Sequence, residues 1–355
     1  MTREELLARI KGETLEVPVI NELELTGLNL SQADLKGAAF NKVDFSRTDF
    51  SGADLSECNF MMCQFADANF TGAVFKLTSF VECNLANACF TSAKLNSSNF
   101  VKCKTEKANF SASNQDKVNY IECDFTGADF TRSSSEFMTF ITCSLNKADF
   151  SHATMFRPNF IDPLLEGIIL EQTKLELAFF QNANFDGYDF SKVEIKHCQF
   201  RESKLNKASF KGRDVSQCGF MEAQLIGANF SNIIGNNVMF IKAQLVGSQF
   251  NNAALGQALF NEATATLCDF SNANLVQAQF TQADISQSSF VDADLDYADF
   301  SHANLNSANM SNTRLFRTNL HEIKEDKSTW LGANRSVALE TDEARKKAET
   351  FMKPL

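Results

Sequence analysis

Residues 298–305 read ADFSHANL, residues 125–130 read FTGADF and residues 31–35 read SQADL. These stretches share a small residue, then Asp or Asn, then Leu or Phe, then two variable residues. The pattern recurs every five residues from about Leu25 to Leu320, without insertion or deletion, and gives 60 pentapeptides. A period of five fits neither the 3.6-residue turn of an α-helix nor the two-residue repeat of a strand. It predicts a coil that turns a corner every five residues, with one large and one small residue pointing inward.

The large residues form columns. From residue 40 to residue 300, 25 of the 27 positions divisible by ten are Phe, and the exceptions are Tyr120 and Leu170. Leu dominates the positions halfway between them. Stacked identical side chains of this kind are typical of cross-β ladders, and burying a Phe stabilises a fold by roughly 1.5–3 kcal/mol. We interpret the Phe columns as core, with no functional meaning of their own.

The motif A-(D/N)-(L/F)-x-x resembles the repeats of the pentapeptide-repeat family and covers about 300 of the 355 residues. The resemblance implies an all-β solenoid, specifically a right-handed quadrilateral β-helix with four pentapeptides in each coil. Sixty pentapeptides then make about 15 coils. Each coil contacts only its neighbours, so stability is expected to be roughly additive along the solenoid.

Both ends of such a solenoid need covers, because an open coil exposes unpaired backbone groups. The predicted domains are an N-terminal helical cap at 1–20, the β-helix at 21–320 and a C-terminal cap with a helix at 321–355. The helices themselves are expected at 2–11 and 342–352.

Local signals support both caps. Thr2 and Glu5 have the spacing of a capping box. The second helix carries Ala344, Ala348, Phe351 and Met352 on one side, and the only Trp, at position 330, is expected to pack beside it.

Composition excludes several classes of protein. The chain has 33 Lys plus Arg against 44 Asp plus Glu, so its formal charge is −11. This balance argues against direct binding of nucleic acid, which depends on Lys and Arg replacing counterions. No stretch approaches 18 apolar residues, and the charged N-terminus lacks the apolar core of a secretory signal. We therefore expect a cytoplasmic protein without a membrane span, whose ten Cys are reduced thiols.

Five of these cysteines recur at intervals of 20 residues, from Cys63 to Cys143. Parallel Cβ vectors about 4.8 Å apart are too far apart for a disulfide, and no His or carboxylate joins them for zinc. They occupy the small-residue position where Ala usually stands. We interpret them as packing residues, and we predict neither a metal site nor a cofactor.

One outward position is unexpectedly apolar. Between residues 61 and 161, the residue after every second Phe, again at intervals of 20, is Met, Val or Ile, whereas the equivalent position on the opposite side of the coil is mostly Ser or Thr. Exposed apolar area often marks an interface. The equally weighted alternative is a half-buried corner that tolerates β-branched residues. This apolar column comprises Met61, Val81, Val101, Ile121, Ile141 and Ile161.

Two segments interrupt the pattern. At 155–180, Phe156, Leu164, Ile169 and Phe179 fall at outward positions, which predicts either a kink or a surface covered by a partner. At 103–136, polar residues replace the inward Leu or Phe at three positions, so a bulge or bound water is expected there. These three are Thr105, Gln115 and Ser135. Drift within a tolerant repeat is the plainer reading of both segments.

Nothing in the sequence indicates catalysis, since it contains no phosphate-binding loop, no H-E-x-x-H and no nucleophile at a recognisable spacing from a base. The first hypothesis is a non-enzymatic bacterial scaffold or adaptor: a rigid rod whose apolar column, with the outward residues of 155–180, binds other proteins. The N-terminal lead-in MTREELLARIKGE resembles that of family members serving as accessory proteins of type VI secretion systems, which implies secretion-apparatus or effector proteins as partners. Family members also form homodimers through a C-terminal element; capping alone is the alternative here.

The second hypothesis is a DNA mimic. The resemblance includes family members that bind DNA gyrase or topoisomerase through an acidic surface and so protect it from quinolones. In this chain the segment 261–310 has seven acids and no Lys or Arg, although part of this acidity belongs to the repeat motif. The candidate mimic residues are Asp284, Asp292, Asp294, Asp296 and Asp299.

Overall fold

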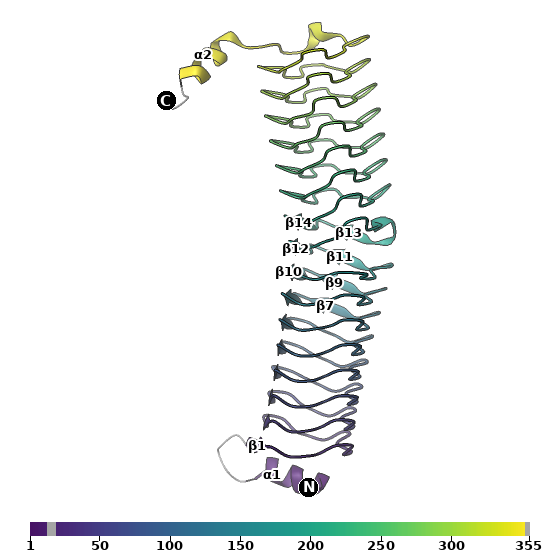
Figure 1. Cartoon of the computed structure of the whole chain (residues 1–355), viewed down its shortest axis with the longest axis vertical. Coiled ribbons are helices and arrows are strands. Elements are labelled where there is room, and N and C mark those ends of the chain that lie inside the picture. The colour runs from purple at the N-terminus through teal and green to yellow at the C-terminus, as the bar shows by residue number, and fades with distance from the viewer. Residues whose placement is uncertain (13–18, 352–355) are drawn as a thin grey trace. The chain divides into compact units, whose positions relative to one another are not determined.

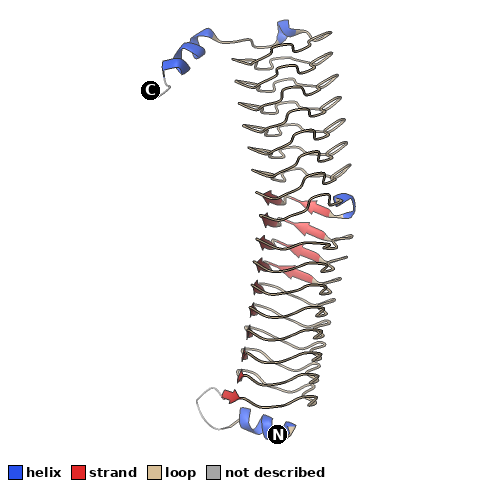
Figure 2. Ribbon diagram, in the orientation of Figure 1, coloured by secondary structure: helices blue, strands red, loops and turns tan. Residues whose placement is uncertain are grey.

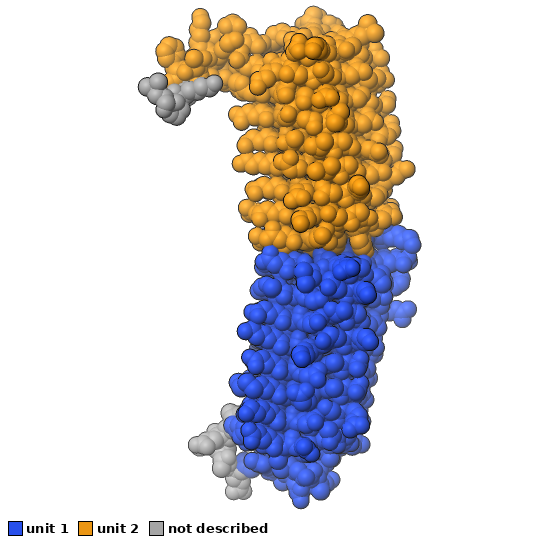
Figure 3. Space-filling model, viewed as in Figure 1, with its two compact units in different colours: residues 1–179, 192–194 blue, residues 180–191, 195–355 orange. Residues whose placement is uncertain are grey.

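The computed structural model describes residues 1–12 and 19–351 (Figure 1). The chain divides into two compact units, coloured separately in Figure 3. Unit 1 comprises Met1–Phe179 and Lys192–Glu194, and unit 2 comprises Phe180–Ser191 and Ile195–Leu355. Each is an all-β solenoid of parallel coils, as the sequence predicts.

In unit 1, eight three-residue strands are neighbours in one parallel sheet, in the order β1-β2-β3-β4-β5-β6-β8-β10. Each strand pairs with the next at a shift of 20 residues, so Phe60 lies beside Phe80 and Phe80 beside Phe100. The strands are β1 (Val19–Asn21), β2 (Ala39–Asn41), β3 (Asn59–Met61), β4 (Ser79–Val81), β5 (Asn99–Val101), β6 (Asn119–Ile121), β8 (Thr139–Ile141) and β10 (Asn159–Ile161).

A second sheet of unit 1 contains β7 (Ser134–Glu136), β9 (Thr154–Phe156) and β11 (Lys174–Glu176). Near the division between the units lie β12 (Phe179–Gln181), the 3₁₀ helix η1 (Phe190–Lys192), β13 (Glu194–Lys196) and β14 (Gln199–Arg201). In the rest of unit 2, isolated parallel bridges replace strands, as the tan coils of Figure 2 show. The prediction of 15 coils comes from counting pentapeptides. Fewer coils than that contain a strand of three residues, because the others pair only through isolated bridges.

The backbone turns every five residues because of the Asp or Asn of the motif. Asp49 Oδ1 accepts a hydrogen bond from the Ser51 amide at 3.0 Å, and Asp54 Oδ1 accepts one from the Ser56 amide at 2.9 Å. The residue after each of these Ser has a positive φ, which is 65° at Gly52 and 62° at Glu57. An Asx side chain that binds its own backbone two residues on is a known turn-former.

The Phe columns form the core, as predicted. Phe130 and Phe150 stack at a centroid distance of 4.5 Å with planes 1° apart. Rings of the two columns meet edge to face, for example Phe90 and Phe100 at 6.3 Å. Stacked and edge-to-face pairs both suit the quadrupole of an aromatic ring.

The helix α1 (Arg3–Ile10) covers the first coil of unit 1. Its capping box is formed: the Glu5 amide donates to Thr2 Oγ1, and the Thr2 amide donates to Glu5 Oε2. The Arg3 guanidinium donates to the carbonyl oxygen of Ser31 at 2.8 Å. Leu6 is fully buried. The predicted end of this cap, at residue 20, follows residues 13–18, which lie outside the described residues.

The C-terminal end of unit 2 carries the 3₁₀ helix η2 (Arg335–Val337) and the helix α2 (Glu343–Phe351). The Arg335 guanidinium lies 4.6 Å from the centre of the Trp330 ring. Contrary to expectation, the apolar side of α2 is not packed, because Ala344 and Ala348 are exposed and Phe351 is 91% exposed. The fourth residue of that predicted side, Met352, lies outside the described residues.

Candidate functional site

The apolar column lies on one outward side of the main sheet of unit 1. Val101 pairs in register with Val81 on one side and with Ile121 on the other, so the column is continuous over β3, β4, β5, β6, β8 and β10. Met61 is 48% exposed, and the other five residues are half-buried. Strand geometry causes this, because the residues on either side of an inward Phe must point outward.

The column has polar borders. On the far side of the Phe, amides stack; Asn119 Nδ2 donates to Asn99 Oδ1 at 2.9 Å. Directly after the column come exposed residues with positive φ, including Glu82, Lys102 and Glu122. Lys102 and Glu122 form an ion pair at 3.8 Å. The column is thus a narrow apolar stripe between a row of Asn, Ser and Thr side chains and a rim in which Glu82, Lys102 and Glu122 are charged.

The outward residues of 155–180 do not join this stripe. Phe156 lies on β9, in the other sheet, and is half-buried. Leu164 is 61% exposed and Ile169 is 42% exposed, and each forms an isolated bridge to the coil before it. Phe179 is half-buried, with its amide bonded to the carbonyl of Pro158 at 2.9 Å.

Sequence reasoning missed an aromatic–arginine cluster on that second sheet. The Arg157 guanidinium lies 5.1 Å from the ring centre of Phe156 and 5.5 Å from that of Phe137. The available signal was Phe137 itself, which falls outside the Phe columns and has a φ of 59°.

The pairing at 103–136 keeps its register, so the predicted bulge is wrong. Bridges join Lys104 to Asp124 and Asn114 to Ser134, as they do in regular coils. The inward polar side chains find partners within the core: Thr105 donates to the Asp124 carbonyl, and Gln115 bonds Ser113. The Ser135 hydroxyl, in contrast, has no hydrogen-bond partner within the described part of the chain.

The cysteine ladder is buried and packs as predicted, and its thiols bond the backbone. Cys83 Sγ donates to the Phe60 carbonyl at 3.5 Å, and Cys143 Sγ donates to the Tyr120 carbonyl at 3.3 Å. The hydrogen bond with Cys103, together with burial, raises the pKa of Cys123 to about 12. All ten cysteines are free thiols.

Most of the candidate acidic residues in unit 2 are bound within the chain. Asp284 accepts from the Ser286 amide and from Asn304, and Asp299 accepts from the Ser301 amide. Asp294 and Asp296 both pair with Arg314, Asp294 at 3.0 Å. Asp292 is exposed, and its carboxylate has no hydrogen-bond or ion-pair partner among the described residues.

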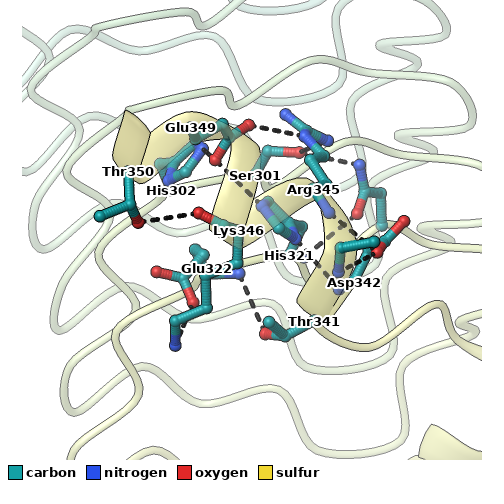
Figure 4. Close-up of polar contacts among 12 residues, drawn as sticks. Ser301, His302, His321, Glu322, Thr341, Asp342, Arg345, Lys346, Glu349 and Thr350 are labelled. Atoms are coloured by element: carbon teal, nitrogen blue, oxygen red, sulfur yellow. Dashed lines mark hydrogen bonds and ion pairs between the residues drawn. The ribbon is translucent and has the colours of Figure 1, made fainter. Parts of the chain in front are cut away.

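The structure also assembles a cluster that the sequence did not indicate, the α2 clip, formed by His302, His321 and Glu349 (Figure 4). Glu349 Oε2 lies 3.1 Å from His302 Nε2 and 3.2 Å from His321 Nε2. The other oxygen of Glu349 accepts from Arg345 Nε at 2.7 Å. These bonds, Arg345 first and then His321, lower the pKa of Glu349 to about 2. No sequence spacing links a residue beyond the repeat to these two His.

Two His and one Glu within 4.8 Å of one another are a plausible donor set for zinc, but the hydrogen bonding does not fit. The Asp342 amide donates to His321 Nδ1 at 3.1 Å, so Nδ1 holds a lone pair. The proton of the neutral ring therefore sits on Nε2, the atom that would face the metal. A His that ligates a metal normally donates a hydrogen bond from the N–H of its other ring nitrogen. The α2 clip is thus a hydrogen-bonded contact that holds α2 against its coils.

The same cluster offers no nucleophile–base pair. The Ser301 hydroxyl, beside His302 in sequence, donates to Asp299. A hydrolytic triad needs the hydroxyl to bond the imidazole.

Models of the pentapeptide repeats match residues 24–61, 63–100, 218–257, 248–287 and 286–321, and a model of the pentapeptide repeat region matches residues 134–210. The chain belongs to the pentapeptide-repeat family. A comparison with curated protein sequences finds no match. Among the described residues, no helix is both long and apolar enough to cross a membrane.

Solved structures of other pentapeptide-repeat proteins are similar to this chain. Full-length QnrB1, a plasmid-mediated fluoroquinolone resistance protein, is 18% identical, with a TM-score of 0.38 over 62% of this chain and 94% of QnrB1. HetL of the cyanobacterium Nostoc sp. strain PCC 7120, involved in regulating heterocyst differentiation, is 18% identical, with a TM-score of 0.25 over 96% of this chain and 98% of HetL. Scores this low support no inference about partners.

Proposed function

We propose that this pentapeptide-repeat protein is a non-enzymatic scaffold that binds another protein through the apolar column of unit 1. The observation that carries the proposal is the unbroken register of six apolar side chains on an outward face, beside polar borders. A stripe of this kind would be covered by an apolar partner surface, while its borders would supply hydrogen bonds at the rim. We place the protein in the cytoplasm, where its buried thiols stay reduced.

The DNA-mimic hypothesis, with DNA gyrase as partner, is the less favoured candidate. A mimic needs continuous negative potential, and potentials sum over all nearby charges. Arg314 neutralises the centre of the acidic segment by pairing with Asp294 and Asp296. A role beside a type VI secretion system stays a prediction from the N-terminal resemblance.

The test is the double variant Val101→Asp with Ile121→Asp in the full chain. The two new carboxylates lie in the middle of the stripe and would be buried when the partner binds. They should abolish capture of the partner from the native host, because an unpaired charge is costly to desolvate. The far-UV circular dichroism and the melting temperature should stay unchanged, since both positions are already half-solvated.

The matched control is Thr91→Asp with Ser111→Asp, in the opposite column of hydroxyl residues. The Thr91 and Ser111 hydroxyls lie 3.3 Å apart. The two residues belong to neighbouring coils, and so do Val101 and Ile121. The control should capture the partner normally. Capture retained by the Val101–Ile121 variant would refute the proposed interface, and recovery of gyrase by both variants would favour the acidic segment.

A further inference from the structure

The chain itself shows how a helix lies on this corner of the coil. In unit 2, α2 contacts Ser301 and His321, which occupy the same place in the 20-residue period as Met61 and Val101 of the apolar column. Figure 4 shows α2 lying across these coils, with contacts distributed along its length. Asp342 bonds His321 from the start of α2, and Glu349 reaches both His from its last turn.

The contact in unit 2 is polar because the column is polar at the coils that α2 contacts, whereas its earlier members Met221 and Ile241 are apolar. At these coils its members are Thr281, Ser301 and His321, and they face the polar side of α2. The apolar side of α2 is left exposed, as Phe351 shows. From β3 to β10 of unit 1 the same coil position is Met, Val or Ile, so a helix seated there would have to present apolar residues instead.

The dimensions of the apolar column suit a helix of ordinary length. Its six residues lie on neighbouring strands about 4.8 Å apart and span roughly 24 Å. A helix of about 16 residues has that length, and its pitch of about 5.4 Å brings one side chain per turn to the same line. The two spacings differ by only about 0.6 Å, so helix turns and coils stay within about half a coil spacing of each other over four turns.

The charged rim indicates what should border the apolar side chains. In unit 2 the rim residue Glu322 pairs with Lys346 of α2 at 2.8 Å. Glu82 and Glu122 occupy the equivalent rim position in unit 1, and both are exposed. Lys102 lies between them in the same rim and pairs with Glu122 at 3.8 Å, so Glu82 is the carboxylate of the two without an ion pair among the described residues. A partner helix with Lys or Arg beside its apolar residues would repeat this pairing.

We propose that the apolar column binds an amphipathic α-helix of a partner protein, with one apolar residue on each turn and basic residues facing Glu82 and Glu122. This inference rests on the proposed scaffold function and specifies the element that the scaffold recognises.

The experiment uses the full chain and two synthetic, fluorescently labelled peptides of about 16 residues. The first is stapled as a helix, with Leu on every turn and Lys beside each Leu. The second has the same composition but alternates Leu and polar residues, as an extended strand would. Fluorescence anisotropy measures both. We expect the helical peptide to bind at least ten times more tightly than the alternating one, and to lose at least tenfold in affinity to the Val101→Asp, Ile121→Asp variant.

Two further variants sharpen the result. Glu82→Gln with Glu122→Gln should weaken the helical peptide about threefold at low salt and less at high salt, because exposed charges are screened. Thr91→Asp with Ser111→Asp should leave its affinity unchanged.

The inference is overturned if the helical peptide does not bind, if it binds the Val101–Ile121 variant equally well, or if the alternating peptide binds as tightly. Its failure is separable from failure of the proposed function. Partner capture that is lost in the Val101–Ile121 variant, together with no helix binding, leaves the interface standing and removes only the helix.

Discussion

Tyr120 shows at the scale of one residue how this core tolerates polar groups. It interrupts a column of Phe, is fully buried, and donates its hydroxyl to Gln115 Oε1 at 2.8 Å. Gln115 in turn donates to the Ser113 hydroxyl at 2.8 Å. Burial raises the pKa of Tyr120 well above its ordinary value, so the phenol remains a donor. The two polar substitutions therefore compensate each other within one coil.

The pair makes a testable prediction. Tyr120→Phe removes the donor and leaves the buried Gln115 oxygen unsatisfied, which should cost about 1–3 kcal/mol. The double change Tyr120→Phe with Gln115→Leu should recover most of that loss, because both partners become apolar. Native-state hydrogen exchange of the amides in these coils measures the effect locally. Equal stability of the single variant and wild type would contradict this account.

The cysteine ladder gives a second prediction at this scale. Replacing Cys83, Cys103 and Cys123 by Ala removes weak thiol donors from positions that Ala fills elsewhere in the repeat. Each change should cost less than about 1 kcal/mol, measured by chemical denaturation. A much larger loss would mean that the thiols have a role beyond packing.

At the scale of the element, α2 is attached almost wholly by polar contacts. Asp342, directly before the helix, and its residues Arg345, Lys346 and Glu349 bind the coils, while its apolar side stays exposed. A helix of nine residues is marginal by itself in water. Its order therefore depends on these contacts, and above all on the Glu349 carboxylate.

This dependence sets the pH response of α2. The docked state lowers the pKa of Glu349 from 4.5 to about 2, so docking favours the charged carboxylate. The stabilisation should be complete above about pH 4.5 and should fall as the pH drops towards 2. Amide exchange of residues 343–351 follows it. Glu349→Gln should speed exchange in α2 at neutral pH, whereas the control Glu343→Gln should not; equal exchange in both would argue against the α2 clip.

At the scale of the whole molecule, the 20-residue period governs which alterations the fold accepts. Deleting residues 221–240 removes one complete coil of unit 2 and leaves Phe260 in the column of Phe220. Deleting residues 221–225 instead shifts every later column by one side, so Leu would meet Phe. The first deletion should lower the melting temperature by less than about 5 °C, since each coil contacts only its neighbours. The second should lower it far more; similar melting of both would show that column identity matters little.

Much of this architecture was predictable from the repeat. The period of five, the buried Phe columns and the capping box at Thr2 all follow from local patterns that the structure retains. The apolar column was predictable too, because in-register coils turn a 20-residue sequence spacing into a line of neighbours. At 103–136 the predicted bulge was wrong, since the loss of apolar residues from the sequence does not reveal that Gln115 and Tyr120 satisfy each other.

The α2 clip and the Arg157 cluster could not be predicted from the sequence, for a related reason. His302, His321 and Glu349 come from two coils and a helix outside the repeat, so no spacing relates them. The backbone bridges likewise continue past Leu320, to Thr329 and Leu339, where the side-chain motif has ended.

The sequence by itself determined the family, the solenoid and the side chains that point inward, because a strict period places each residue by counting. Only the tertiary structure decided which outward residues are engaged. Asp294 and Asp296 read as free acids in the sequence but lie against Arg314, and α2 turns its polar side to the coils instead of its apolar one. Such contacts depend on distances between chain segments that no repeat encodes.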